Sequence, residues 1–317
     1  MGSLSKSHET LETASGEYLR RLSFILSELY RIKKTGALVE KTRKGKSMGK
    51  DIHEKLNDLR RILASYGSIA VAFSGGVDST FLLKAAHDVL GNRCIALTAR
   101  SAGFPAREMQ EAIRFCEREN IRQIFFDSGE MQLEAYVNNA KDRCYHCKKM
   151  IFSRMKELAA QQGITCVAEG SNMDDLGDYR PGLQAIKELA VLSPLRESDL
   201  YKAEIRALSK EMGLETWNKP SFACLASRFA YGERITPEKL HMVEQAEEVL
   251  RDIGLTQYRV RLHGNMARVE VLPKDFDFIL QEENRERILR EFKAAGFTYI
   301  TMDLQGYRTG SMNEVLS

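Results

Sequence analysis

Hydrophobic and polar positions alternate with two different periods along the chain, and the period distinguishes expected strands from expected helices. Between residues 51 and 235, short apolar runs are separated by longer stretches in which apolar residues recur with helical spacing. The runs that have the length of buried parallel strands are SIAVAF (68–73), CIALTA (94–99), IRQIFFD (121–127) and ITCVAEG (164–170). The stretches with helical spacing are 51–67, 80–91, 105–120, 131–140 and 144–163. This alternation predicts an α/β fold with a doubly wound parallel sheet.

The pattern changes after residue 236. A helical stretch (237–254) is followed by two strands of alternating character, 257–264 and 266–273, and the Gly264-Asn265 pair between them favours a hairpin. A further helix is expected over 275–295 and a last strand over 297–304. The sequence therefore predicts three parts: a basic N-terminal extension (1–50), a first domain (51–235) and a second, smaller α+β domain (236–317) for substrate binding or oligomerisation.

Composition narrows the environment in which this fold is expected to work. With 43% apolar and 29% charged residues, the 317-residue chain has the make-up of a globular protein, and it lacks an apolar run of the length that crosses a membrane. Its six cysteines are too few for a disulfide scaffold. That favours a reducing, cytoplasmic compartment, in which clustered cysteines serve metal binding or catalysis.

Positive charge is concentrated at the N-terminus. The first 50 residues contain 11 Lys and Arg but 5 Asp and Glu, which predicts a solvated, flexible extension. A targeting or RNA-binding arm is the alternative. Because the whole chain carries a net charge of +3, the remainder is slightly acidic, and a nucleic-acid partner for the folded body is not expected.

A turn rich in glycine and hydroxyl residues, SGGVDS (74–79), follows the first expected strand, where ligands of open α/β sheets bind. Gly75 and Gly76 allow the backbone to close around a phosphate at the start of the next helix, and Ser74 and Ser79 add hydroxyl donors. Asp78 is placed to hold Mg²⁺. The turn lacks the lysine of a Walker loop, so backbone amides are expected to hold pyrophosphate. The alternative is a plain Gly-Gly turn with a helix-capping serine.

The motif S-G-G-x-D-S after a buried strand resembles the PP-loop of ATP pyrophosphatases, which include GMP and NAD synthetases, argininosuccinate synthetase and tRNA thiolases. Members of this superfamily cleave ATP between its α- and β-phosphates and adenylate a carboxylate or carbonyl oxygen. That oxygen then leaves when nitrogen or sulfur attacks. The resemblance implies an adenine nucleotide alpha hydrolase-like fold, with ATP and Mg²⁺ as cofactors, and leaves the acceptor open.

Four longer stretches narrow the acceptor: 169–195, 218–232, 259–271 and 303–313. Together they are similar to the LarE family of ATP-dependent sacrificial sulfur transferases, which acts in building the nickel-pincer nucleotide of lactate racemase. The resemblance implies that the chain adenylates a carboxylate of pyridinium-3,5-biscarboxylic acid mononucleotide, a small-molecule nucleotide substrate. Pyrophosphate is released, and the acid becomes a thiocarboxylic acid.

The same resemblance implies roles for individual residues. Those expected to contact ATP, besides the residues of the turn, are Gly170, Asp175 and Arg180. For Asp175 and its neighbour Asp174, helix capping, Mg²⁺ binding and ribose binding stay open. The residues expected to take part in catalysis are Asp78, Cys224, Ser227 and Arg228, the last two in a loop between the expected domains.

Arg259 and Arg261 are two residues apart on an expected strand, so both guanidinium groups lie on one face. Paired guanidiniums suit a phosphate monoester such as that of a nucleotide. We therefore expect Arg259, Arg261 and the neighbouring Glu270 to form the substrate-phosphate site. The alternative is a cross-strand salt bridge with acids such as Glu270.

Cys144 and Cys147 form a C-x-x-C pair on an expected helix, where their spacing puts them on one face. Cys224 lies in the loop KPSFACLASR (219–228). In one branch of the family a lone loop cysteine gives up its own sulfur. In the other, three cysteines hold a 4Fe–4S cluster whose fourth iron stays open for sulfide. Because all three thiols occur here, we expect the second branch. The remaining cysteines, expected in the core, are Cys94, Cys116 and Cys166.

Other interpretations of these thiols and of the fold stay open. A structural zinc would need His146 or His263 as a fourth ligand. Cys224 could be the sacrificial donor, with the pair unmetallated. A tRNA thiolase shares the turn and the three cysteines but predicts a basic face and zinc-ribbon cysteines, and a non-catalytic nucleotide or metal sensor is a further class. The enzyme is expected to be a homo-oligomer.

Overall fold

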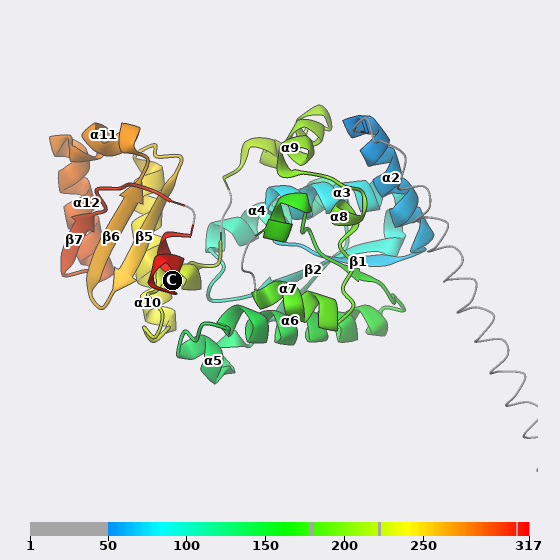
Figure 1. The fold of residues 1–317 in the computed structure, drawn as a ribbon, viewed down its shortest axis with the longest axis horizontal. Coiled ribbons are helices and arrows are strands. Elements are labelled where there is room, and N and C mark those ends of the chain that lie inside the picture. The colour runs from blue at the N-terminus through cyan, green and yellow to red at the C-terminus, as the bar shows by residue number, and fades with distance from the viewer. Residues whose placement is uncertain (1–49, 178–180, 221–222, 309, 317) are drawn as a thin grey trace, which may run out of the picture. The chain divides into compact units, whose positions relative to one another are not determined.

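The computed structural model describes residues 50–177, 181–220, 223–308 and 310–316 (Figure 1). Residues 51–317 form one compact unit, and all but the last residue of the expected N-terminal extension falls outside the described residues. The boundary expected at residue 235 stays a prediction. Within the described part of the chain, no helix is both long and apolar enough to cross a membrane.

The larger sheet is parallel and has the strand order β3-β2-β1-β4, which confirms the expected α/β class. Its strands are β1 (Ile69–Ala72), β2 (Cys94–Arg100), β3 (Gln123–Asp127) and β4 (Val167–Ala168). Strand β4 is shorter than the expected 164–170 because the chain leaves the sheet at Glu169. The buried Glu169 carboxylate accepts hydrogen bonds from the backbone and hydroxyl of Ser171 and from Ser193 Oγ, and these bonds hold the segment that follows the strand.

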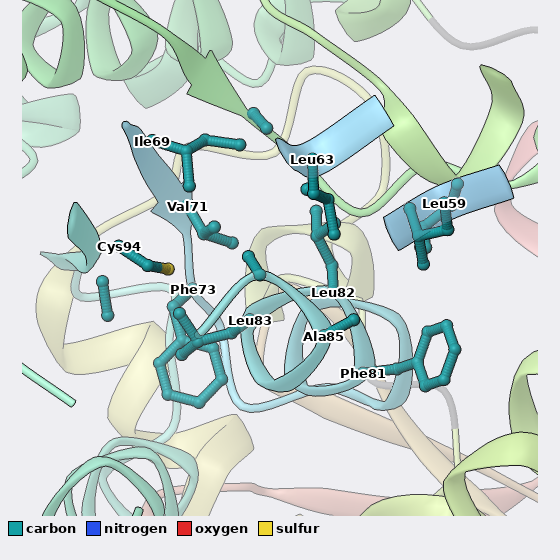
Figure 2. Packing of buried hydrophobic residues seen from close by; sticks show 14 of the residues in the cluster. Leu59, Leu63, Ile69, Val71, Phe73, Phe81, Leu82, Leu83, Ala85 and Cys94 are labelled. Carbon is teal, nitrogen blue, oxygen red and sulfur yellow. The ribbon is translucent and has the colours of Figure 1, made fainter. Parts of the chain in front are cut away.

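Helices cover both faces of this sheet (Figure 1). One face packs against α2 (Ile52–Ser65), α3 (Val77–Leu90), α4 (Ala106–Arg118), α8 (Pro194–Glu197) and α9 (Lys202–Glu211). The other face packs against α6 (Arg143–Gln161) and α7 (Pro181–Glu188). Alternate residues of β1 serve the two cores: Val71 joins Leu59, Leu63 and Phe81 in the first (Figure 2), whereas Ala70 joins the second.

The prediction of a single helix over 131–140 is wrong. The chain forms a short turn, η2 (Glu130–Gln132), and a one-turn helix, α5 (Glu134–Val137), with extended backbone at Leu133. Asn139 then takes a left-handed backbone (φ 50). This fully buried side chain donates to the carbonyls of Phe229 and Ala230, at 3.3 and 2.6 Å. Tertiary hydrogen bonds thus override the local helical pattern.

The smaller sheet has the order β5-β6-β7. Its elements are α10 (Pro237–Asp252), β5 (Tyr258–His263), β6 (Met266–Val271), α11 (Phe276–Leu280), α12 (Glu282–Ala295) and β7 (Tyr299–Met302). The hairpin at Gly264-Asn265 is confirmed, and β7 pairs in parallel with β6. The helix expected over 275–295 is broken at Gln281, whose backbone is extended. Leu225, Ala226 and Phe229, from the loop that carries Cys224, pack into this sheet's core.

Candidate active site

The SGGVDS turn occupies the carboxyl end of β1 and the start of α3. Gly75 has a left-handed backbone (φ +66), and a Cβ there would lie 3.3 Å from the Cβ of Ala112 in α4, so glycine is required. The hydroxyl oxygens of Ser74 and Ser79 are 3.1 Å apart, and Ser79 Oγ donates to the Gly76 carbonyl. The turn therefore presents hydroxyls at a helix N-terminus, an arrangement that binds phosphate.

Asp78, in the first turn of α3, is paired with a cation that the sequence pattern did not predict. Lys202 Nζ lies 2.5 Å from Asp78 Oδ2, and Asn172 Nδ2 lies 3.3 Å from Asp78 Oδ1. Lys202 begins α9 and is 124 residues away along the chain. The side chains of Lys202 and Asp78 are 26% and 23% exposed, so solvent reaches this ion pair.

A second distant lysine, Lys219, contacts the same turn. Its Nζ donates to the Gly75 carbonyl at 3.1 Å and lies 2.5 and 2.7 Å from the carboxylates of Glu108 and Glu111 in α4. Burial raises the pKa of Glu108, whereas the hydrogen bond from Lys219 lowers the pKa of Glu111 in spite of its burial. Lys219 precedes Cys224 by five residues, so it fixes the start of the cysteine-bearing segment against the phosphate-binding turn.

The segment that follows β4 packs tightly on the start of α3. A Cβ on Gly170 would come within 3.0 Å of Ser79 N, so only glycine permits this close approach. Asp175 Oδ2 accepts the backbone N–H of Asn172, and Asp174 Oδ2 accepts that of Lys202. Both aspartates therefore cap backbone groups in the structure. The expected ATP ligand Arg180 lies outside the described residues.

The thiol of Cys224 lies between two other segments. Its Sγ is 3.8 Å from the hydroxyl of Tyr136, and a Cβ on Gly103 would come within 2.6 Å of the sulfur. The backbone N–H of Leu225 donates to the Gly103 carbonyl at 2.9 Å. Although the residue as a whole is exposed, its sulfur is closely surrounded, and burial raises the pKa of the Cys224 thiol.

A buried carboxylate, that of Glu130, fixes the loop that packs against this thiol. Glu130, which is 2% exposed, accepts hydrogen bonds from Ser101 Oγ at 2.7 Å and from the Ala102 N–H at 2.8 Å. These bonds fix the loop after β2 that carries Gly103. Glu130 therefore acts on Cys224 through the position of that loop.

The three expected ligand thiols gather in one region. Cys144 is exposed and Cys147 half-buried at the start of α6. Burial raises the pKa of the Cys147 thiol to about 12, and the nearby thiols of Cys224 and Cys144 add to the effect. The start of α6 is tied to the segment after Cys224, because Arg143 stacks on the Tyr231 ring, 5.4 Å from its centroid.

Arg228 is fully buried and holds the backbone around Cys224. Its Nε and Nη2 each lie 2.9 Å from a carboxylate oxygen of Glu247 in α10. Its Nη1 donates to the carbonyls of Ala223 and Cys224, at 2.7 and 3.3 Å, and lies 3.0 Å from Ser227 Oγ. Arg228 thus positions the cysteine loop in the structure, and contact of Ser227 or Arg228 with an intermediate stays a prediction.

The expected phosphate-binding arginines are both buried, at 5% exposure for Arg259 and 6% for Arg261. Arg261 Nη2 lies 2.8 Å from the fully buried carboxylate of Glu270, which is the cross-strand pairing that the sequence left open. Arg259 lies over the ring of Tyr307, at 5.4 Å from its centroid. Burial and the nearby Arg228 lower the pKa of Arg259, so this region is rich in positive charge.

The functional side chains that the sequence analysis missed are Glu130, Tyr136, Lys202, Lys219 and Glu247. Glu247 did leave a signal, because it interrupts the apolar face of the helix 237–254 among buried residues such as Val243 and Leu250. Lys219 lies in the stretch 218–232 that the sequence analysis singled out, but its contact with the turn, more than 100 residues away, left no signal, and Lys202 left none at all.

The donor sets fit the expected cofactors to different degrees. Among the described residues, no three His, Cys, Asp or Glu side chains converge on a point where a single metal ion would be bound. His146, a possible zinc ligand, lies 3.0 Å from Asp142 instead. Three grouped thiols suit a 4Fe–4S cluster, whose ligands bind separate irons. At Asp78 the ammonium of Lys202 occupies the position of a cation beside Oδ2, so Mg²⁺ would have to displace Lys202 to bind this carboxylate oxygen.

Comparison with known proteins gives relatives over most of the chain, although no family model matches it. An uncharacterized protein of Synechocystis is 40% identical over 266 residues, which cover 84% of this chain and 99% of that protein. The pyridinium-3,5-bisthiocarboxylic acid mononucleotide synthase of Lactiplantibacillus plantarum is 38% identical over 266 residues, covering 83% and 92%. A subunit of the glutamine-hydrolyzing GMP synthase of Thermoplasma acidophilum is 30% identical over 202 residues, covering 59% and 64%.

Proposed function

The chain belongs to the LarE family of ATP-dependent sulfurtransferases, and from this premise we propose that it converts pyridinium-3,5-biscarboxylic acid mononucleotide to a thiocarboxylate in nickel-pincer cofactor biosynthesis. The relative from Lactiplantibacillus plantarum is named for synthesis of the bisthiocarboxylic acid. The observation that carries the proposal is the contact of Lys219 with Gly75. It joins the phosphate-binding turn to the segment that leads to Cys224.

In the first step, a carboxylate oxygen of the substrate attacks the α-phosphorus of ATP. The bond to the β-phosphate breaks, pyrophosphate leaves with the electron pair, and an acyl-adenylate forms. The turn 74–79 would hold the phosphates through its hydroxyls and N–H groups, and Asp78 would bind the Mg²⁺ that neutralises their charge. Gly170 keeps the neighbouring segment close enough to enclose the phosphates.

The substrate phosphate would bind at Arg259 and Arg261. Both guanidiniums are buried, and Glu270 fixes the orientation of Arg261 through its ion pair. The lowered pKa of Arg259 means that burial and neighbouring cations disfavour its charge, so a bound phosphate dianion would stabilise that charge.

In the second step, sulfur displaces AMP from the acyl-adenylate. A 4Fe–4S cluster held by Cys144, Cys147 and Cys224 would supply the sulfide when bound. The alternative is single-turnover donation by Cys224 itself: its thiolate forms a thioester, AMP leaves, and β-elimination yields the thiocarboxylate and dehydroalanine. In either case Arg228 and Glu247 hold the loop that delivers the sulfur.

The test is anaerobic purification with iron and sulfide assays on the wild type and on Cys144→Ala, followed by intact mass after turnover with ATP and substrate. We expect iron and labile sulfide in the wild type, loss of both in the variant, and an unchanged protein mass. A protein free of iron that loses about 34 Da at Cys224, the mass of one H₂S, would overturn the cluster and leave the sacrificial route. Absence of both pyrophosphate release and thiocarboxylate would overturn the function itself.

A further inference from the structure

A Walker loop contains a lysine in its own sequence. The turn 74–79 has none, and the fold instead brings Lys202 to it from a distant segment. Lys202 Nζ lies 2.5 Å from Asp78, at the N-terminus of α3 where phosphate is expected. Its backbone is fixed at the first position of α9, because the Lys202 N–H donates to Asp174 Oδ2 at 2.7 Å. The backbone is thus anchored, while the long side chain is 26% exposed and ends in an ammonium on four rotatable carbons.

The Asp78 carboxylate cannot keep its ion pair with Lys202 and bind Mg²⁺ through the same oxygen atom. An ammonium and a metal ion compete for the same carboxylate oxygens, and Lys202 occupies Oδ2 in the structure. Asn172 donates its amide N–H to the other oxygen, Oδ1, which leaves Oδ2 as the position at which the two cations exchange. A displaced ammonium beside a polyphosphate has an evident new partner, because charge-assisted hydrogen bonds to phosphate are strong.

We propose that Lys202 is a phosphate-binding residue that exchanges partners: it neutralises Asp78 in the free enzyme and moves to the β- and γ-phosphates when Mg²⁺-ATP brings a metal ion to Asp78. The proposal rests on the proposed function, since it assumes that ATP binds at the turn 74–79. It assigns Lys202 two linked effects, competition with the metal for Asp78 and attraction of the pyrophosphate part of ATP.

The test compares Lys202→Gln with the matched control Lys84→Gln. Lys84 lies on α3, is 22% exposed and forms an ion pair with Asp88, so its removal deletes one similar charge away from the turn. Binding of Mg²⁺-ATP and of pyrophosphate is measured by calorimetry, and binding of Mn²⁺ without nucleotide by electron paramagnetic resonance. These measurements do not depend on sulfur transfer.

For Lys202→Gln we expect Mg²⁺-ATP and pyrophosphate to bind about tenfold to a hundredfold more weakly. Mn²⁺ alone should bind more tightly than to the wild type, because the competing ammonium is gone. Lys202→Arg should keep most of the nucleotide affinity, and Lys84→Gln should match the wild type in all three measurements.

Two results would overturn the role of Lys202: nucleotide affinity of Lys202→Gln within about threefold of the wild type, or Mn²⁺ binding that is not strengthened. If Lys202 only anchors α9, its removal does not strengthen Mn²⁺ binding. The second result would therefore assign Lys202 a purely structural role. If Lys202→Gln does not fold, the same comparison is made with Lys202→Arg and Asp78→Asn, of which only the latter should lose Mn²⁺. A wild type that does not bind Mg²⁺-ATP would instead overturn the proposed function.

Discussion

Two ion pairs serve the two halves of the proposed reaction, and they differ mainly in exposure. Arg228 and Glu247, behind the cysteine loop, are 0% and 5% exposed, and the guanidinium also holds two carbonyl groups. Lys202 and Asp78, at the phosphate-binding turn, are 26% and 23% exposed and make few other contacts. The buried pair is held by several hydrogen bonds and is costly to separate, whereas the partly exposed pair can exchange its partner for a ligand.

Removing one partner of the buried pair should have the largest effect on stability. In Glu247→Ala the Arg228 charge stays buried without its carboxylate, so the free energy of unfolding should fall by about 3–5 kcal/mol. The measurement is urea denaturation of the metal-free protein. The double variant Arg228→Met with Glu247→Met should recover most of this loss, because neither charge of this pair is then left buried without its partner. A loss below about 1 kcal/mol for Glu247→Ala would erase the contrast between the two pairs.

A smaller steric change should disturb the cysteine loop and spare the ATP turn. In Gly103→Ala the new Cβ would lie 2.6 Å from Cys224 Sγ and 2.7 Å from Tyr136 Oη, so one of them must move. We expect a stability loss of about 1–3 kcal/mol and a fall in thiocarboxylate formation, measured by mass spectrometry of the product. Mg²⁺-ATP binding should stay as in the wild type; a parallel fall in both would show that the two regions are not separable.

Breaking the half-exposed pair should cost little stability and much binding. In Asp78→Asn, the free energy of unfolding should change by less than about 1 kcal/mol, because solvent screens the pair. Mg²⁺-dependent ATP binding should weaken at least about tenfold, since the metal loses its carboxylate. Calorimetry with and without Mg²⁺ separates the two effects. Unfolding at moderate urea, comparable to that of Glu247→Ala, would place Asp78 among the structural residues.

An ion pair at the surface, between Lys149 and Glu188, completes the series with the smallest effect. Hydrogen bonds from Tyr145 and Lys149 lower the pKa of Glu188 from 4.5 to about 2. Because the folded pKa lies below the unfolded value, any stabilisation is present at neutral pH and is lost as the pH falls from about 4.5 to about 2. The free energy of unfolding of Glu188→Gln should therefore equal that of the wild type within error at pH 2, and should differ from it at most slightly at pH 7. A difference that grows toward low pH would contradict the assigned direction.

The sequence predicted the features that depend on local pattern and missed those that depend on contacts between distant segments. The parallel sheet, the hairpin and the turn 74–79 depend on local pattern, so period and glycine placement were sufficient for them. The roles of Lys202 and Lys219 could not be predicted, because each lysine contacts the turn from a segment that is distant in the sequence. The broken helix at 131–140 escaped for a related reason, since Asn139 satisfies its side chain on carbonyls far along the chain. The exposure of a side chain could not be predicted either: the sequence places Arg228 in a loop, yet its side chain is fully buried.

The hydrogen bond from Asn139 to Phe229 also sets an order of events during translation. The two residues are 90 positions apart, so Asn139, which precedes the helix that bears the C-x-x-C pair, leaves the ribosome long before the residue whose carbonyl it binds. Chains fold from the N-terminal side as they are made, and the turn 74–79 is among the early parts. A nascent chain halted before residue 229 lacks the carbonyl groups of Phe229 and Ala230 that accept the hydrogen bonds of Asn139. The hydrogen bonds that fix the segment before the C-x-x-C helix to the residues after Cys224 therefore form only after that point of synthesis.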